Sequence, residues 1–155
     1  MDYGPERLLP YLEFHPAKGE EWHRAQVRCA CGETSFSVAY SGRVLKSILG
    51  RISLFQQDDS AAAVYARCSR CGQEMMLFHS IADSSPPPPD GETGNERLQS
   101  QLCPKCGNSL WRIQMEFEYP SDDDDPLPRL QWERISLKCA CCGYLAKNYL
   151  DLEIE

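Results

Sequence analysis

The sequence predicts a small, mainly β protein that contains an internal duplication and is cross-linked by metal. Three observations lead to this fold class: the cysteines occur in four clusters, every cluster ends in Cys-Gly, and apolar residues alternate with polar ones in several segments. The chain has 155 residues and nine cysteines, while Leu, Ile, Val and Phe make up only about a fifth of it. A chain with so few core residues needs disulfides or metal ions for stability.

Length and composition exclude several classes of protein. No stretch approaches the ~20 consecutive apolar residues of a membrane-spanning helix. Residues 1–10 lack the basic and then apolar layout of a secretion signal. We therefore expect a cytoplasmic protein without membrane partners, in a reducing compartment where cysteines remain thiols.

The cysteine clusters have the spacing of metal-binding turns. Two thiolates in one tight turn require the next residue to adopt positive φ, which Gly tolerates best. Backbone N–H groups in such a turn, called a knuckle below, point at the sulfurs and offset their charge. Cysteine pairs that recur after a gap are typical of zinc sites and are rare among disulfides. The clusters are Cys29/Cys31, Cys68/Cys71, Cys103/Cys106 and Cys139/Cys141/Cys142.

The two halves of the chain repeat one plan: knuckle, strand, loop, strand, knuckle, strand. The interval from Cys31 to Cys68 is 36 residues, and the interval from Cys106 to Cys139 is 32. Each repeat of about sixty residues is too small to be stable alone, and one metal ion per repeat supplies the missing free energy. The predicted divisions are an N-terminal arm (1–25), a first repeat (26–81), a Pro/Gly-rich linker (82–96) and a second repeat (97–155).

Apolar periodicity places strands within the repeats. One side of the segment 111–119 is apolar and the other is polar, which indicates a strand with one face in the core. Shorter alternations occur at 36–40 and 150–154. Residues 45, 48, 49 and 52 have helical spacing, but Gly50 interrupts it, so a short helix and a pair of strands both fit. The apolar side of the longest strand comprises Trp111, Ile113, Met115, Phe117 and Tyr119.

The paired cysteine-glycine motifs resemble the zinc-ribbon superfamily, in which two Cys-x-x-Cys-Gly knuckles on β-hairpins hold one zinc ion. The resemblance covers 26–81 and 97–155 and implies two tandem zinc ribbons that hold two zinc ions. It implies Cys29, Cys31, Cys68 and Cys71 as the ligands of the first ion, and Cys103, Cys106, Cys139 and Cys142 as those of the second.

Two departures from the zinc-ribbon pattern leave alternatives open. The first knuckle is one residue short, so either its turn is tighter or His23 replaces a ligand. The last cluster has an extra thiol. Cys142 precedes Gly143, as the second cysteine does in the other knuckles, so we expect Cys142 to be the ligand and Cys141 to be a buried free thiol. The alternative is a redox switch, in which oxidation of Cys141 releases zinc.

The metal itself has two candidates. The turns at 103–107 and 142–144 are also similar to rubredoxin knuckles, which hold iron between four thiolates. Four thiolates suit zinc or iron, and zinc is favoured.

The motifs do not predict an enzyme. A catalytic zinc needs an open coordination position and a nearby general base, whereas a four-thiolate site is closed. No His-Glu-x-x-His stretch occurs, and His15, His23 and His79 are not clustered. We therefore expect structural metals and no catalytic residues.

Charge separates the two halves and suggests a partner. Residues 1–81 contain nine Lys/Arg and nine Asp/Glu, whereas residues 82–155 contain seven and fourteen, so the formal net charge of −7 lies in the second half. Its densest run is the acidic segment 121–126. We expect a protein-binding adaptor whose acidic half docks on a basic partner.

Nucleic acid is the alternative partner. Arg43, Lys46 and Arg51 have no acidic residue between them and are the best candidates for phosphate contacts. The cations beside the knuckles have a simpler role, since they offset the charge of the thiolates. These cations are Arg28, Arg67, Arg70, Lys105 and Lys138.

Overall fold

The computed structural model describes residues 5–15, 22–56, 61–81, 83, 97–119 and 132–153. Within these residues the chain forms one short 3-10 helix and eleven β-strands, so the prediction of a small, mainly β protein is confirmed. The predicted linker apart from Asp83, the acidic run at 121–126 and Ile154 lie outside the described residues.

The described elements are one short helix and the strands of two antiparallel sheets. In the part of the chain that the structure describes, no helix is long and apolar enough to cross a membrane. The elements are η1 (Glu6–Tyr11), β1 (Leu12–Phe14), β2 (Trp22–Val27), β3 (Phe36–Ser41), β4 (Arg43–Lys46), β5 (Ile52–Phe55), β6 (Ala63–Cys68), β7 (Glu74–His79), β8 (Gln99–Ser100), β9 (Leu110–Glu118), β10 (Trp132–Cys139) and β11 (Leu145–Glu153).

Strand β9 joins the two halves of the chain. Nine strands form one antiparallel sheet in which β9 pairs with β10 along one edge and with both β2 and β3 along the other. The contact with β3 is short, with Phe36 opposite Trp111 and Ser37 opposite Leu110. Because β9 follows the predicted linker while β2 and β3 precede it, the two halves share one sheet.

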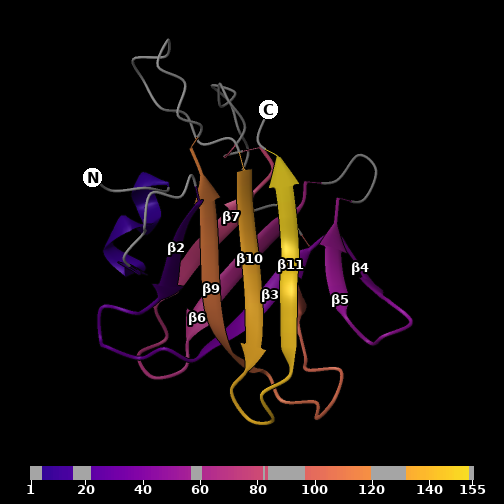
Figure 1. Ribbon diagram of the computed structural model, residues 1–155. Coiled ribbons are helices and arrows are strands. Elements are labelled where there is room, and N and C mark those ends of the chain that lie inside the picture. Colours follow the sequence, from indigo (N-terminus) through magenta and orange to yellow (C-terminus); the bar gives the residue numbers. More distant parts are fainter. Residues whose placement is uncertain are drawn as a thin grey trace.

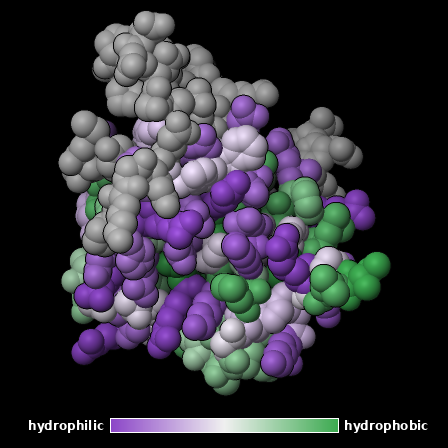
Figure 2. Space-filling model, in the orientation of Figure 1, coloured by the Kyte–Doolittle hydropathy of each residue, from purple (hydrophilic) through white to green (hydrophobic). Residues whose placement is uncertain are grey.

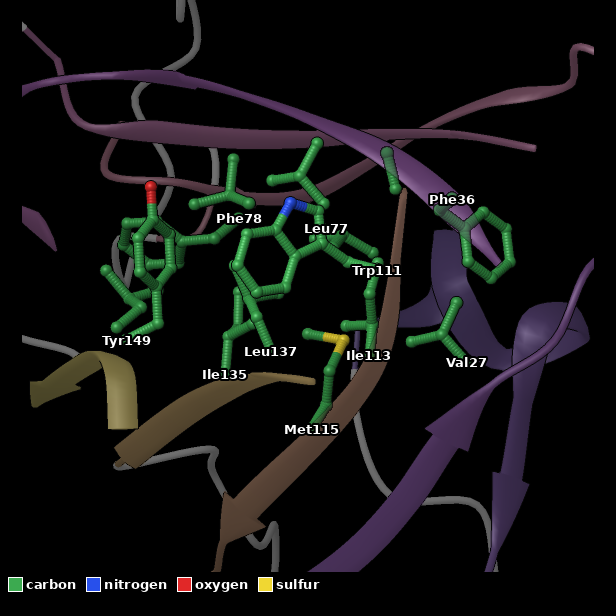
Figure 3. Close-up of a cluster of buried hydrophobic side chains, with 14 of the residues drawn as sticks. Val27, Phe36, Leu77, Phe78, Trp111, Ile113, Met115, Ile135, Leu137 and Tyr149 are labelled. Atoms are coloured by element: carbon green, nitrogen blue, oxygen red, sulfur yellow. The ribbon is translucent and has the colours of Figure 1, made fainter. Parts of the chain in front are cut away.

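The sheet curls into two layers around a common core. Figure 1 shows β9, β10 and β11 in front of β3, β6 and β7. The side chains drawn in Figure 3 point into the space between these layers. Four residues of the predicted apolar stripe are at most 1% exposed, which confirms that this side of β9 is core. They are Trp111, Ile113, Met115 and Phe117.

Residues 43–55 form a separate two-stranded hairpin, so the structure decides between the two alternatives and the short helix is wrong. The turn at its base depends on glycine. Gly42 has φ +132°, and a Cβ there would lie 2.7 Å from the carbonyl oxygen of Phe55. The hairpin lies beside β11, at the right of Figure 1.

The strands of the two halves pair in the same register relative to their cysteines. Phe36 lies opposite Cys68 in the β3–β6 pair, and Trp111 lies opposite Cys139 in the β9–β10 pair. The next backbone hydrogen bond is also repeated: Ser69 N–H donates to the Ser35 carbonyl (3.1 Å), and Ala140 N–H donates to the Leu110 carbonyl (3.0 Å). Both halves therefore form a three-stranded meander, β3–β6–β7 and β9–β10–β11, with equivalent turns at one end.

The N-terminal segment packs on this sheet. Leu8 in η1 is 1% exposed, and the guanidinium of Arg7 donates to both carboxylate oxygens of Asp83 at 2.6 and 2.9 Å. Strand β1 pairs with β2, which pairs with β9. Residues 22–25, predicted as the end of the arm, therefore belong to a strand of the sheet.

Candidate metal centres

The turns that carry the cysteines lie at one end of the sheet. In the first half they connect β2 to β3 and β6 to β7; in the second half they precede β9 and connect β10 to β11. The register described above brings each first turn beside the second turn of the same half. The structure groups Cys29, Cys31, Cys68 and Cys71, and separately Cys103, Cys106, Cys139 and Cys142.

The four sulfurs of each set are spaced for one metal ion. In each set all four sulfurs lie within 4.8 Å of one another. The closest pairs are 3.4 Å (Cys29 to Cys71) and 3.5 Å (Cys31 to Cys68) in the first set, and 3.6 Å for both pairs in the second. A tetrahedral zinc with Zn–S bonds of about 2.3 Å places sulfurs about 3.8 Å apart. A disulfide needs about 2.05 Å, so these spacings fit a shared metal and not disulfide bonds.

Each knuckle is closed by its glycine. Gly32, Gly72, Gly107 and Gly143 have φ between +77° and +95°, which confirms the prediction of positive φ. In the last three turns the glycine N–H donates to the carbonyl of the first cysteine, four residues earlier. Side chains at these positions would strain the turns, because L-residues rarely adopt this conformation.

The shortened first knuckle makes the same turn with one residue fewer. Gly32 N–H donates to the carbonyl of Cys29, only three residues earlier, at 2.8 Å. This tighter turn brings both cysteines into the first set without help from His23. His23 lies instead on β2, with its ring 6.1 Å from that of Tyr119. The tighter turn, and not replacement by histidine, is therefore the alternative that the geometry favours.

Backbone donors stabilise negative charge on one buried sulfur in each set. The N–H groups of Arg70 and Cys71 point at the Cys68 sulfur (3.4 and 3.5 Å), and that of Cys142 points at the Cys139 sulfur (3.5 Å). Burial alone would raise the pKa of the Cys68 thiol, but these donors and the neighbouring thiols lower it to about 6. The pKa of Cys139 is also lowered to about 6, by the equivalent backbone and thiol bonds acting against burial. Against a backbone hydrogen bond that lowers it, burial and the neighbouring thiols raise the pKa of Cys29 and of Cys106 to about 12, so each set concentrates its negative charge on one sulfur.

The ninth cysteine lies outside both sets. Cys141 is exposed, so the expectation that it is buried was wrong. It occupies the middle of the β10–β11 turn, where its side chain faces solvent while Cys139 is buried and Cys142 completes the set. The thiol next to the glycine is therefore the one that joins its set, as in the other three knuckles.

The two sets have closed, sulfur-only surroundings. In each set two cysteines are buried and two are exposed. The groups of potential metal ligands among the described residues contain no histidine or carboxylate. Such a donor set suits zinc or iron and leaves no position for a substrate or water. Each set could therefore hold one metal ion between its two turns.

Two features beside the sulfur sets, and one buried carboxylate farther along the sheet, were not predicted from the sequence. The Tyr144 hydroxyl donates to the Gly50 carbonyl (2.6 Å) and accepts from Ile52 N–H (3.2 Å), which ties the last knuckle to the β4–β5 hairpin. The Asn108 amide reaches the Cys139 sulfur at 3.9 Å. Glu133, at the far end of β10, is 0% exposed. Of these three features, only the burial of Glu133 could have been predicted from the sequence, because Glu133 shares its side of the strand with Ile135 and Leu137.

No protein-family model, curated protein or solved structure matches this chain. Its function is therefore inferred from the two sulfur sets and from the surfaces beside them.

Proposed function

We propose that this protein binds two zinc ions in closed, structural tetrathiolate sites. The observation that carries the proposal is the convergence of four sulfurs within 4.8 Å in each set, with closest pairs of 3.4–3.6 Å. Zinc is the metal most often bound by four cysteines on paired knuckles. Thiolate ligands also imply a reducing compartment, and we place the protein in the cytoplasm.

The fold that we propose is a pair of tandem zinc ribbons that arose by duplication. The shared register supports this, because Phe36 and Trp111 occupy equivalent positions relative to Cys68 and Cys139. The four positive-φ glycines support it as well. In this proposal each zinc fastens the two turns of one ribbon, and β9 binds the ribbons together.

The role that we propose is that of a non-enzymatic adaptor. Closed metal sites provide no reaction centre, so the useful parts of the molecule are its surfaces. The excess of negative charge in residues 82–155 favours a basic protein partner. Proteins captured on the zinc-loaded chain should be lost in high salt, and also when Asp122, Asp123, Asp124 and Asp125 are all replaced by Asn. Capture that is unaffected by both changes would contradict the acidic docking surface.

Elemental analysis of protein purified without oxygen tests the metal sites. We expect two zinc ions per chain in the wild type and one in either Cys68→Ser or Cys139→Ser. Cys141→Ser is the matched control, since its thiol lies outside both sets, and it should retain two. The absorption spectrum separates the metals, because a tetrathiolate iron site is strongly coloured and a zinc site is colourless.

Each proposed site can fail separately. One zinc per chain in the wild type, with no further loss in Cys68→Ser, would contradict the first site and its shortened knuckle. Loss of zinc from Cys141→Ser would contradict the ligand set of the second site. Iron in freshly purified protein would replace the structural role with electron transfer as the leading hypothesis.

A further inference from the structure

The β4–β5 hairpin presents apolar side chains to solvent. Ile48 and Leu49, at its tip, have relative exposures of 105% and 96%, and Leu45 and Phe55 are 44% and 50% exposed. In Figure 2 a strongly apolar surface lies at the right, where the hairpin projects in Figure 1. Apolar side chains gathered at one exposed place are typical of a binding surface, because they do not contribute to the core.

The hairpin is held in this position by its opposite face. Ile52 and Leu54 are 4% and 3% exposed and belong to the hydrophobic core. Leu45 lies opposite Ser53 and Arg43 lies opposite Phe55, so these four residues share the outer face. The inner face therefore anchors the hairpin, and the outer face and the tip remain free.

The tip itself is well defined. Ser47 N–H donates to the carbonyl of Arg51 (2.8 Å), and Gly50 N–H donates to the carbonyl of Ser47 (2.9 Å). Tyr144, which follows the last knuckle, adds two hydrogen bonds: its hydroxyl donates to the Gly50 carbonyl and accepts from Ile52 N–H. The exposure of Ile48 and Leu49 is thus built into a fixed turn.

Cations flank this apolar tip on both strands. Lys46 precedes the tip, Arg51 follows it, and Arg43 lies farther along the outer face. The sequence has no acidic residue between Gly42 and Gln56. None of the three cations forms an ion pair with any residue that the structure describes. The hairpin therefore combines a projecting apolar tip with three cations that have no ion-pair partner in the part of the chain that the structure describes.

We propose that the β4–β5 hairpin docks on an anionic lipid surface. A projecting turn with two aliphatic side chains fits a fluid bilayer interface, where the tip inserts among the acyl chains and the cations behind it meet the headgroups. A protein groove would need a matching shape, whereas a bilayer adapts to the tip. The formal charge of −7 on the chain repels the rest of the molecule from the same surface and orients the hairpin towards it.

This inference goes beyond the proposed function and is independent of the identity of the metal. It also revises the sequence-based expectation of no membrane partner, which rested on the absence of a spanning segment. The interaction is peripheral and reversible, because one short turn inserts. Each Lys or Arg near an anionic surface contributes about 1 kcal/mol, which is about fivefold in the partition coefficient.

Vesicle sedimentation with the zinc-loaded full chain tests the proposal. We expect binding to vesicles of mixed phosphatidylcholine and phosphatidylglycerol, much weaker binding to pure phosphatidylcholine, and loss of binding in high salt. Ile48→Ser with Leu49→Ser should weaken the partition at least about tenfold. Replacing Arg43, Lys46 and Arg51 by Gln should weaken it about a hundredfold.

A matched control uses two other exposed leucines. Leu98 and Leu102 are 43% and 49% exposed and lie outside the hairpin, so Leu98→Ser with Leu102→Ser should leave the partition unchanged. All variants should retain the metal content of the wild type, which shows that the fold is intact and separates this test from that of the metal sites.

Three results would overturn the proposal. The first is failure of the wild type to bind anionic vesicles, and the second is equal binding by the tip variant and the control. The third is binding of a DNA or RNA oligonucleotide, in place of vesicles, that depends on the three cations and not on Ile48 and Leu49. That result would favour a nucleic-acid interface on the same hairpin.

Discussion

The two sulfur sets share one backbone frame but differ in the residue that follows the last glycine of each. In the first half this residue is Gln73, whose exposed amide donates to the neighbouring carbonyl of Glu74 (3.0 Å) and to no other residue that the structure describes. In the second half it is Tyr144, which holds the β4–β5 hairpin through two hydrogen bonds and packs edge-on against Trp111 (6.4 Å between ring centroids). The same kind of turn is therefore followed by a solvent-exposed side chain in the first half and by a side chain that positions the β4–β5 hairpin in the second.

Other equivalent positions are equally buried but carry different side chains. Trp111 and Phe36 lie opposite each other where β9 meets β3, and both are 0% exposed. Six residues before Cys139 stands Glu133, and six residues before Cys68 stands Ala62, again both 0% exposed. The backbone of the halves is therefore repeated more closely than the groups that it buries.

The largest effect is expected at the paired aromatic residues. Trp111→Ala and Phe36→Ala should each lower the free energy of unfolding by about 3–5 kcal/mol, because each removes a large buried side chain. Trp111→Ala should cost about 1 kcal/mol more, since its indole N–H donates to the Gln101 carbonyl at 2.7 Å. Denaturant unfolding of the zinc-loaded variants measures both. A larger loss in Phe36→Ala would contradict the additional contribution of the Trp111 hydrogen bond.

Glu133 should make stability depend on pH. Neither of its carboxyl oxygens has a hydrogen-bond partner among the described residues. Burial raises its pKa well above 4.5, and Asp83 adds to this while Arg7 opposes it. Above pH 4.5 the unfolded chain loses this proton and the folded chain keeps it, so stability falls as the pH rises towards the folded-state pKa.

Glu133→Gln removes this dependence and should therefore gain stability over the wild type as the pH rises above 4.5. Between pH 4.5 and the pKa of the folded state, the gain should grow by up to about 1.4 kcal/mol per pH unit, which is the free energy of the proton that only the folded wild type retains. Thermal unfolding at a series of pH values measures it, and the difference between the two proteins cancels the pH dependence of metal binding. A difference that is constant with pH would contradict the protonated state of Glu133.

The smallest effect is expected at Tyr144 and tests the contrast between the two knuckles directly. Tyr144→Phe removes both hydrogen bonds to the hairpin and should cost about 1 kcal/mol. Amide hydrogen exchange should quicken at Ile52, which loses its acceptor. Gln73→Ala, at the equivalent position, should leave the exchange of the β6–β7 turn unchanged. Equal responses at the two turns would show that Tyr144 does not position the hairpin.

Local chemistry allowed much of the candidate site to be predicted. Cysteine spacing and the following glycine are properties of single turns, so the four knuckles and the positive φ of their glycines followed from the sequence. The apolar side of β9 followed from its period of two. The pairing of equivalent positions, which brings Cys29 to Cys71 and Cys103 to Cys142, had support in the repeat of the two halves.

Only the tertiary structure decided how distant segments meet. The pairing of β2 and β3 side by side along one edge of β9 has no signature in any one segment, because the pairing of strand edges depends on the whole sheet. For the same reason Leu45, Ile48, Leu49 and Ile52 fitted a helix by spacing, whereas packing buries Ile52 and leaves the other three in solvent. The sequence by itself determined which residues turn, alternate and carry thiols. The tertiary structure decided which side chains are buried or exposed, since burial depends on neighbours that are remote along the chain.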